Sequence, residues 1–70
     1  MTESRYKMTI RIIDTLRRLR QRWWTAGELA RVSGVSAKTA RRDVRCCEDL
    51  GAPVIWDGEK YRIRADWRPW

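Results

Sequence analysis

The 70-residue sequence predicts a mainly α-helical fold, with three helices followed by a small β-hairpin. Apolar residues recur at helical spacing over residues 6–22. Two further segments open with a typical helix N-cap residue, Thr25 and Ser36. The dipeptide Asp57-Gly58 separates two short runs with strand-like alternation, which is typical of a hairpin. We expect one domain over residues 1–70, because a chain this short has no room for a second core.

The first predicted helix, residues 6–22, follows a polar segment, residues 1–5, that we expect to be flexible. Its opposite face is rich in arginine. Met8, Ile12 and Leu19 widen the apolar face beyond what a core of this size needs. We therefore expect this helix to mediate self-association. The apolar positions of the helix are Ile10, Ile12, Ile13, Leu16 and Leu19.

A helix-turn-helix core is predicted over residues 25–45, continuing to residue 50. Thr25 and Glu28 have the spacing of a capping box, in which each side chain binds a free amide of the first turn. The helix that they open is short and ends at Gly34, which permits a tight turn. Ser36 then caps the third helix, which Gly51 and Pro53 end.

The third helix has two distinct faces on a wheel of 100° per residue. Ala40, Val44 and Cys47 lie within about 40° of one direction, which predicts the core side. The cations Lys38, Arg42 and Arg45 lie on the opposite side, and Arg41 lies on the flank. We expect Asp43, near the core edge, to orient or neutralise a neighbouring arginine.

The hairpin is predicted over residues 53–64, with Asp57-Gly58 as a two-residue turn. This turn places Trp56 opposite Glu59 and Val54 opposite Tyr61. One face, which covers the helices, then holds Val54, Trp56, Tyr61 and Ile63, with Trp56 packed under the hairpin. The other face holds Ile55, Lys60, Arg62 and Arg64.

Four further tryptophans lie outside the hairpin. Trp23 and Trp24 are expected to seal the junction between the first two helices. The tail, residues 65–70, carries Trp67 and Trp70 without any periodicity. An exposed indole patch on a small domain usually marks an interface. We expect a homodimer that pairs through the first helix and the tail; the alternative is that these tryptophans pack on their own core.

The composition is strongly basic. The 16 Lys and Arg residues outnumber the 9 Asp and Glu residues, and the formal net charge is +7. Thirteen of the cations are arginines, whose forked guanidinium groups suit phosphates and guanine edges. This balance indicates a polyanionic partner, with nucleic acid first. The alternative is a charged surface that serves only solubility.

Residues that other functions require are missing. The chain has no histidine, and its cysteines, Cys46 and Cys47, are adjacent, which suits neither a disulfide nor a metal site. It has no nucleophile–base pair and no glycine-rich phosphate loop, so we expect no enzyme activity, metal or cofactor. It also lacks a signal-peptide pattern and any run of roughly 20 apolar residues, so we expect a cytoplasmic, nucleoid-associated protein.

Three helices with a short second helix, a four-residue turn and a hairpin make a winged helix-turn-helix. A helix fits the major groove of B-DNA, so the exposed cations of the third helix can reach base edges. We expect Lys38 and Arg42 to contact bases and Arg41 and Arg45 to contact phosphates. Thr39 contacts DNA or packs locally. The predicted DNA-binding residues are Ser36, Lys38, Thr39, Arg41, Arg42, Arg45, Lys60, Arg62 and Arg64.

The segment TAGELARVSGVSAKTARRDVRCCEDLGAPVIWDGEKYRI resembles the winged-helix domains of DeoR-type and, more closely, WYL-domain regulators. The resemblance covers roughly residues 8–64. It implies a DNA-binding transcription factor, commonly dimeric, whose third helix enters the major groove. The motif carries DNA contacts onto Ser36, Thr39, Arg41 and Arg42. The sequence departs from it at Ala40 and at the Cys46-Cys47 pair, where larger aliphatic residues are usual.

Such regulators usually continue into an effector-sensing domain, whereas this sequence ends six residues after the hairpin. It is either a stand-alone regulator of the kind that phages and mobile elements use, or a fragment. We expect a sequence-specific double-stranded DNA-binding regulator, a repressor acting as a homodimer. One alternative is an excisionase-like protein that bends DNA. The other is a winged-helix module that binds proteins.

Overall fold

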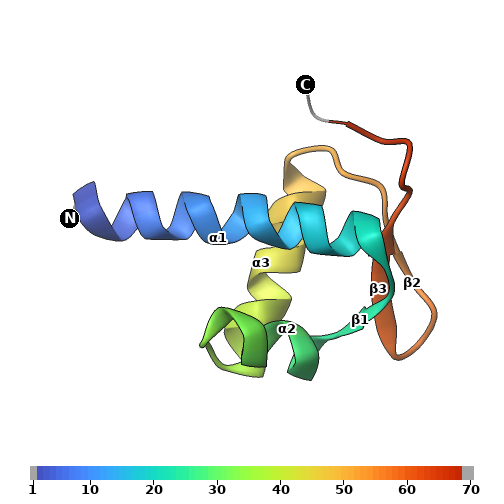
Figure 1. The fold of residues 1–70 in the computed structure, drawn as a ribbon, viewed down its shortest axis with the longest axis horizontal. Coiled ribbons are helices and arrows are strands. Elements are labelled where there is room, and N and C mark those ends of the chain that lie inside the picture. Colours follow the sequence, from blue (N-terminus) through green and yellow to red (C-terminus); the bar gives the residue numbers. More distant parts are fainter. Residues whose placement is uncertain (1, 69–70) are drawn as a thin grey trace.

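The computed structural model describes the backbone of residues 2–68 and the side chains of residues 7–68. It confirms the mainly helical fold with a hairpin, arranged as a winged helix-turn-helix (Figure 1). Within the described residues, no helix is both long enough and apolar enough to cross a bilayer. In chain order the elements are α1 (Thr2–Gln21), β1 (Trp24–Thr25), α2 (Ala26–Ser33), α3 (Ala37–Asp49), β2 (Val54–Trp56) and β3 (Lys60–Ile63).

Helix α1 begins at Thr2, four residues before the predicted start at residue 6, so residues 2–5 belong to the helix. Figure 1 shows the N-terminal half of α1 extending beyond the rest of the fold. The C-terminal half packs on α3 and β3. Arg18 and Arg20 lie in its last turn, where positive charge interacts favourably with the helix dipole.

The core forms where α1, α2, α3 and β3 meet. Its fully buried side chains are Leu19, Leu29, Val44, Cys47 and Ile63. The predicted inward face of α3 is confirmed, because Ala40, Val44 and Cys47 are all buried. Burial raises the pKa of the Cys47 thiol to about 12, so this thiol stays protonated and acts as a small apolar side chain.

Both ends of α2 follow from local sequence. The predicted capping box is present: the Glu28 amide donates to Thr25 Oγ1 at 3.0 Å, and the Thr25 amide donates to Glu28 Oε1 at 2.9 Å. At the other end Gly34 has a φ of 68°, a left-handed conformation that favours glycine. The Val35 amide then donates to the Ala30 carbonyl at 3.0 Å, which closes a Schellman turn.

Helix α3 is bounded in the same way. Ser36 is its N-cap, as predicted. The C-cap is Leu50, and the predicted Gly51 follows it with a φ of 98°. The Ala52 amide donates to the Cys47 carbonyl at 3.1 Å in a second Schellman turn.

The sheet has three antiparallel strands in the order β1-β3-β2, and the sequence pattern did not predict β1. This two-residue strand pairs Trp24 with Tyr61 and Thr25 with Lys60. It places β3 at the centre of the sheet, between β1 and β2. The chain therefore runs from α1 to α2 along the edge of the sheet that β1 forms.

The predicted hairpin register was wrong. Trp56 pairs with Tyr61 and Val54 pairs with Ile63. The Asp57 amide donates to the Lys60 carbonyl at 3.1 Å, so Gly58 and Glu59 are the central turn residues. The Asp57 carboxylate fixes this turn by accepting hydrogen bonds from the amides of Glu59 and Lys60, at 2.9 and 2.7 Å. Because each partner moves by two residues, the predicted division of the strands into two faces is unchanged.

The predicted burial of Trp56 was also wrong, since this side chain is 61% exposed. The body of the protein ends before the tip of the hairpin, so only Val54, Tyr61 and Ile63 of that face pack against the core. The ring of Trp56 instead stacks on Tyr61, with centroids 6.2 Å apart.

The predicted self-association surface needs correction as well. Ile12 and Leu19 are 7% and 0% exposed and belong to the core of their own chain, whereas Met8 is 47% exposed. The apolar face of α1 is wide because it packs against both α3 and β3. Trp67 is partly buried against the core, and Trp70 lies outside the described residues.

Trp24 is buried at the junction of α1 and α2, as predicted. Its indole Nε1 donates to the Arg18 carbonyl at 2.8 Å, so its polar atom is satisfied near the end of α1. The Arg22 guanidinium lies 3.6 Å from the ring centroid and covers the ring from solvent. Trp23 is half-buried.

Candidate nucleic-acid interface

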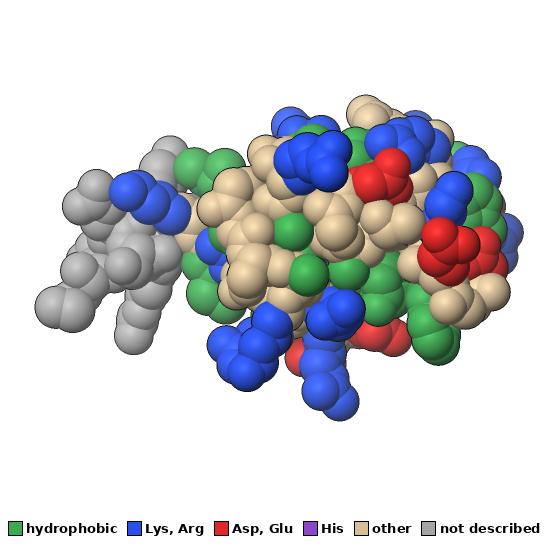
Figure 2. Space-filling model, turned by 90° about the horizontal axis from the view of Figure 1, so that it is seen from below, with side chains coloured by type: hydrophobic (Ala, Val, Ile, Leu, Met, Phe, Trp, Pro, Cys, Tyr) green, Lys and Arg blue, Asp and Glu red, His purple; other side chains and the backbone are tan. Residues whose placement is uncertain are grey.

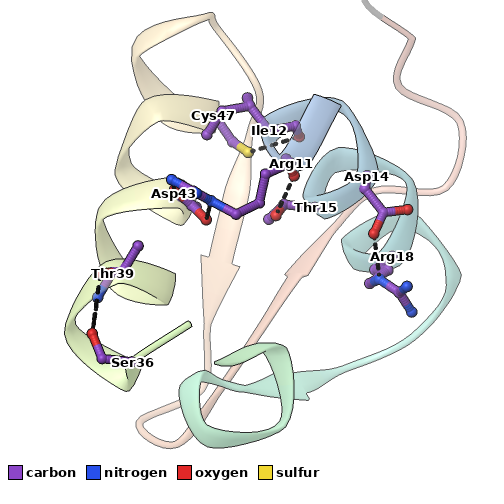
Figure 3. A network of polar contacts seen from close by, with 9 residues as sticks. All are labelled: Arg11, Ile12, Asp14, Thr15, Arg18, Ser36, Thr39, Asp43 and Cys47. Carbon is purple, nitrogen blue, oxygen red and sulfur yellow. Dashed lines mark hydrogen bonds and ion pairs between the residues drawn. The ribbon is translucent and has the colours of Figure 1, made fainter. Parts of the chain in front are cut away.

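Ser36 organises the start of the candidate interface. Its Oγ accepts a hydrogen bond from the Thr39 amide at 3.1 Å and donates one to Thr39 Oγ1 at the same distance (Figure 3). This cap fixes the first turn of α3, where a helix N-terminus favours anions. Ser36 is exposed and Thr39 is half-buried, so Thr39 combines a structural role with partial access to solvent.

The four predicted cations of α3 are exposed together. Lys38, Arg41, Arg42 and Arg45 all point to solvent. Within residues 7–68, none of them makes a hydrogen bond or an ion pair through its side chain. Their charge is therefore available to a partner. By contrast, the paired arginines of the described chain form the ion pairs Arg11–Asp43, Arg18–Asp14, Arg22–Glu28 and Arg64–Asp66.

Asp43 is the only acidic residue between Ser36 and Arg45, and it is turned away from the cations. Its side chain is buried and accepts two bonds from Arg11, Nε to Oδ2 at 2.6 Å and a terminal nitrogen to Oδ1 at 3.1 Å (Figure 3). The hydrogen bond to Asp43 raises the pKa of the Arg11 guanidinium, so this guanidinium remains charged. Between Ser36 and Arg45 the exposed face of α3 therefore carries positive charge without a competing carboxylate, and the exposed carboxylates of α3, Glu48 and Asp49, lie in its last turn.

The contact between Arg11 and Asp43 also joins α1 to α3. The Thr15 hydroxyl donates to the Arg11 carbonyl at 2.8 Å, one turn along α1. The Cys47 thiol lies 4.0 Å from the Ile12 carbonyl and donates to it. Of these polar contacts, Arg11–Asp43 and Cys47–Ile12 join the two helices and constrain the rotation of α3 about its axis, which decides which side chains face solvent. Sequence reasoning predicted an arginine partner for Asp43, and the structure identifies it as Arg11.

Three features come together at one end of the molecule. In Figure 1, α2, the start of α3 and the turn of the hairpin all lie at the lower end. Figure 2 looks onto that end, where Lys and Arg side chains protrude from the outline and acidic side chains are fewer. A ligand lying against this end would meet α3 and the hairpin of β2 and β3, the wing, together.

The basic residues of the wing are less available than those of α3. Lys60 and Arg62 lie on the central strand and are half-buried. Arg64 is exposed but forms a two-bond contact with Asp66, at 3.2 Å from Nε and 3.0 Å from a terminal nitrogen. The predicted wing cations therefore offer a weaker surface than the four cations of α3.

Trp56 is the site residue that sequence reasoning missed. It stands exposed near the tip of the wing beside the stacked ring of Tyr61. Flat aromatic side chains stack on bases and sugars, so this pair is suited to nucleic acid. The sequence signal for its exposure is its place directly before the Asp57-Gly58 turn, at the end of β2.

No protein-family model matches the sequence, and neither the curated proteins nor the solved structures contain a significant match. The resemblance to DeoR-type and WYL-domain regulators stays a prediction from the residues.

Proposed function

We propose that this protein binds double-stranded DNA in a sequence-specific way and represses transcription, with α3 in the major groove. One observation carries the proposal: α3 exposes four cations without internal partners, while the single carboxylate among them is buried against Arg11. A face of this kind attracts a polyanion. An α-helix also has the width that the major groove admits.

The residues take different roles in this arrangement. Arg42 and Lys38 lie on the outermost side of the first turns of α3, where base edges come within reach. Arg41 and Arg45 flank them and suit the phosphates on either side. The capped N-terminus at Ser36 is a second position for a phosphate, because the helix dipole favours negative charge there. Lys60, Arg62 and Arg64 supply weaker contacts from the wing.

The test is selection of bound duplexes from a random pool, followed by footprinting on a selected site. We expect an enriched motif and protection of a short site. Affinity should fall with salt with a logarithmic slope of roughly −0.9 per phosphate contact. A pool without enrichment would contradict sequence-specific binding, and an affinity independent of salt would contradict DNA as the partner.

A DNA-bending role, like that of an excisionase, is the second candidate, and the exposure of Trp56 favours it. Apolar side chains that wedge between base steps kink DNA, and Trp56 is a large, exposed side chain. End-to-end fluorescence transfer on a labelled duplex separates the two candidates. A bend on binding supports the architectural role, and an unbent site supports the repressor.

A further inference from the structure

An apolar groove lies between the projecting half of α1 and the C-terminal end of α3. Its exposed aliphatic side chains are Met8, Ile13 and Leu50, which are 47%, 40% and 64% exposed. Buried Ile12 and half-buried Cys46 also line it. The remaining lining residues are Thr9 and Asp49.

The groove continues the apolar stripe that α1 uses in its own core. Met8 lies one turn before Ile12, which is buried, so the stripe runs on beyond the body of the protein. Leu50 follows the last residue of α3 and stands beside this extension. A helix that projects without packing gains little stability on its own. The groove is therefore a place where a further element can pack.

The charges that line each groove indicate which one a second copy of this chain can bind. The chain carries +7, so two copies repel one another unless they meet at a surface without cations. Two further grooves among the described residues are lined by cations, one by Lys7, Arg11 and Arg17, the other by Arg62 and Arg64. Among residues 7–68, the lining of the Met8–Leu50 groove includes no Lys or Arg and one carboxylate, Asp49. Among these grooves it is the one that a second basic chain can approach without repulsion.

We propose that a second copy of this chain docks in the Met8–Leu50 groove, with the same surface of each copy buried against the other. Two-fold symmetry makes such a contact self-complementary. Met8 and Leu50 of each copy fill the groove of the other, and Asp49 meets cations of the facing α1. This surface keeps Met8 and the buried Ile12 from the predicted interface and adds Ile13 and Leu50. Leu19 and Trp67 do not line it.

Self-association of this kind leaves the first turns of α3 free. Leu50 and Ser36 lie at opposite ends of α3, which spans about 20 Å at 1.5 Å per residue. The groove thus lies a helix length away from the capped first turn. Dimerisation through this groove does not depend on DNA binding, so an experiment can contradict either one without contradicting the other.

The test is sedimentation equilibrium of the full chain from low micromolar to submillimolar concentration. We expect a monomer–dimer equilibrium that strengthens as salt screens the repulsion between the chains. Leu50→Lys and Met8→Lys should each weaken the dimer at least about tenfold, because a charge placed in an apolar interface must be desolvated. The matched control is Val32→Lys, which adds the same charge at a residue of similar exposure, 46%, in the groove with Lys7 and Arg17.

Several outcomes would overturn the proposal. The chain could remain a monomer throughout the concentration range. The dimer could be unaffected by Leu50→Lys and Met8→Lys, or Val32→Lys could disrupt it equally. Circular dichroism and thermal melts verify that each variant is folded, and binding of a labelled duplex below the dimerisation range measures DNA affinity separately.

Cys46 provides an independent readout inside the groove. Its thiol is partly accessible, whereas Cys47 is buried and its pKa is raised to about 12, so alkylation reports mainly on Cys46. The rate of reaction with iodoacetamide should fall as protein concentration rises. In Leu50→Lys that dependence should be lost. A rate independent of concentration in the natural chain would contradict the groove as the interface.

Discussion

Arg11 of α1 and Asp43 of α3 form a two-bond ion pair in which the carboxylate side chain is 4% exposed and the guanidinium side chain is 27% exposed. This asymmetry predicts unequal effects of removing either partner. Arg11→Ala leaves a buried charge without a partner and should cost about 3–5 kcal/mol of unfolding free energy. Asp43→Ala should cost less, because Arg11 can still reach water. Urea unfolding of both variants measures the difference, and equal losses would contradict this account.

Acidification should destabilise the protein through two carboxylates. Hydrogen bonding from the Thr25 amide lowers the pKa of Glu28 below its ordinary 4.5, and the amides of Lys60 and Glu59 lower the pKa of Asp57 below 3.8. A depressed folded pKa means that the stabilisation is present above the ordinary pKa and is lost as pH falls through the folded value. Melting temperatures should therefore drop below about pH 4.5. In the double variant Glu28→Gln and Asp57→Asn the drop should be smaller, and an unchanged profile would contradict these assignments.

Leu19 should matter for folding rather than for assembly. It is fully buried, so Leu19→Ala should cost about 2–5 kcal/mol of unfolding free energy. Met8→Ala removes a side chain that is nearly half exposed and should cost far less. Chemical denaturation of the two variants compares these effects. Similar losses would mean that the projecting half of α1 is packed more tightly than its exposure indicates.

Arg42 should determine sequence discrimination. Arg42→Ala should cost about 1–3 kcal/mol on a selected site and reduce the preference for that site over scrambled DNA. Arg17→Ala removes the same charge from an exposed position on α1, away from α3, and is the matched control. Titrations of both duplexes by fluorescence anisotropy give the ratios. If both variants discriminate as well as the natural chain, Arg42 does not read bases.

The two tryptophans Trp24 and Trp56 should behave in opposite ways. Trp24 is buried and its indole is hydrogen-bonded, so Trp24→Ala should cost about 3–5 kcal/mol of unfolding free energy. Trp56 is largely exposed, so Trp56→Ala should cost less than about 1 kcal/mol and instead weaken DNA binding. Thermal unfolding and duplex titration of each variant test this contrast. Unchanged DNA affinity in Trp56→Ala would remove Trp56 from the interface.

The features that the sequence predicts correctly depend on residues close together in the chain. The Thr25–Glu28 capping box and the inward face of Ala40, Val44 and Cys47 each follow from helix geometry alone. Strand β1 has two residues, and only the distant β3 defines it as a strand. The turn was ambiguous because Gly58 fits either central position, and hydrogen bonds to the Asp57 side chain decide between them.

Exposure was the hardest property to predict. Ile12 and Leu19 lie on the apolar face of α1 together with Met8, and sequence periodicity does not show where the covering elements end. Trp56 shares a strand face with buried residues for the same reason. The surface cations of α3 were predictable because one helix wheel contains both their positions and those of the core residues.

Thr25 has two structural roles, because it pairs with Lys60 in the sheet and caps α2 with its side chain. A hinge motion of the wing away from α2 would have to break the strand pairing, the cap or both. The wing and the helix-turn-helix should therefore move as one rigid body. Any change of shape that a close fit requires would then have to occur in the bound molecule and not in the protein.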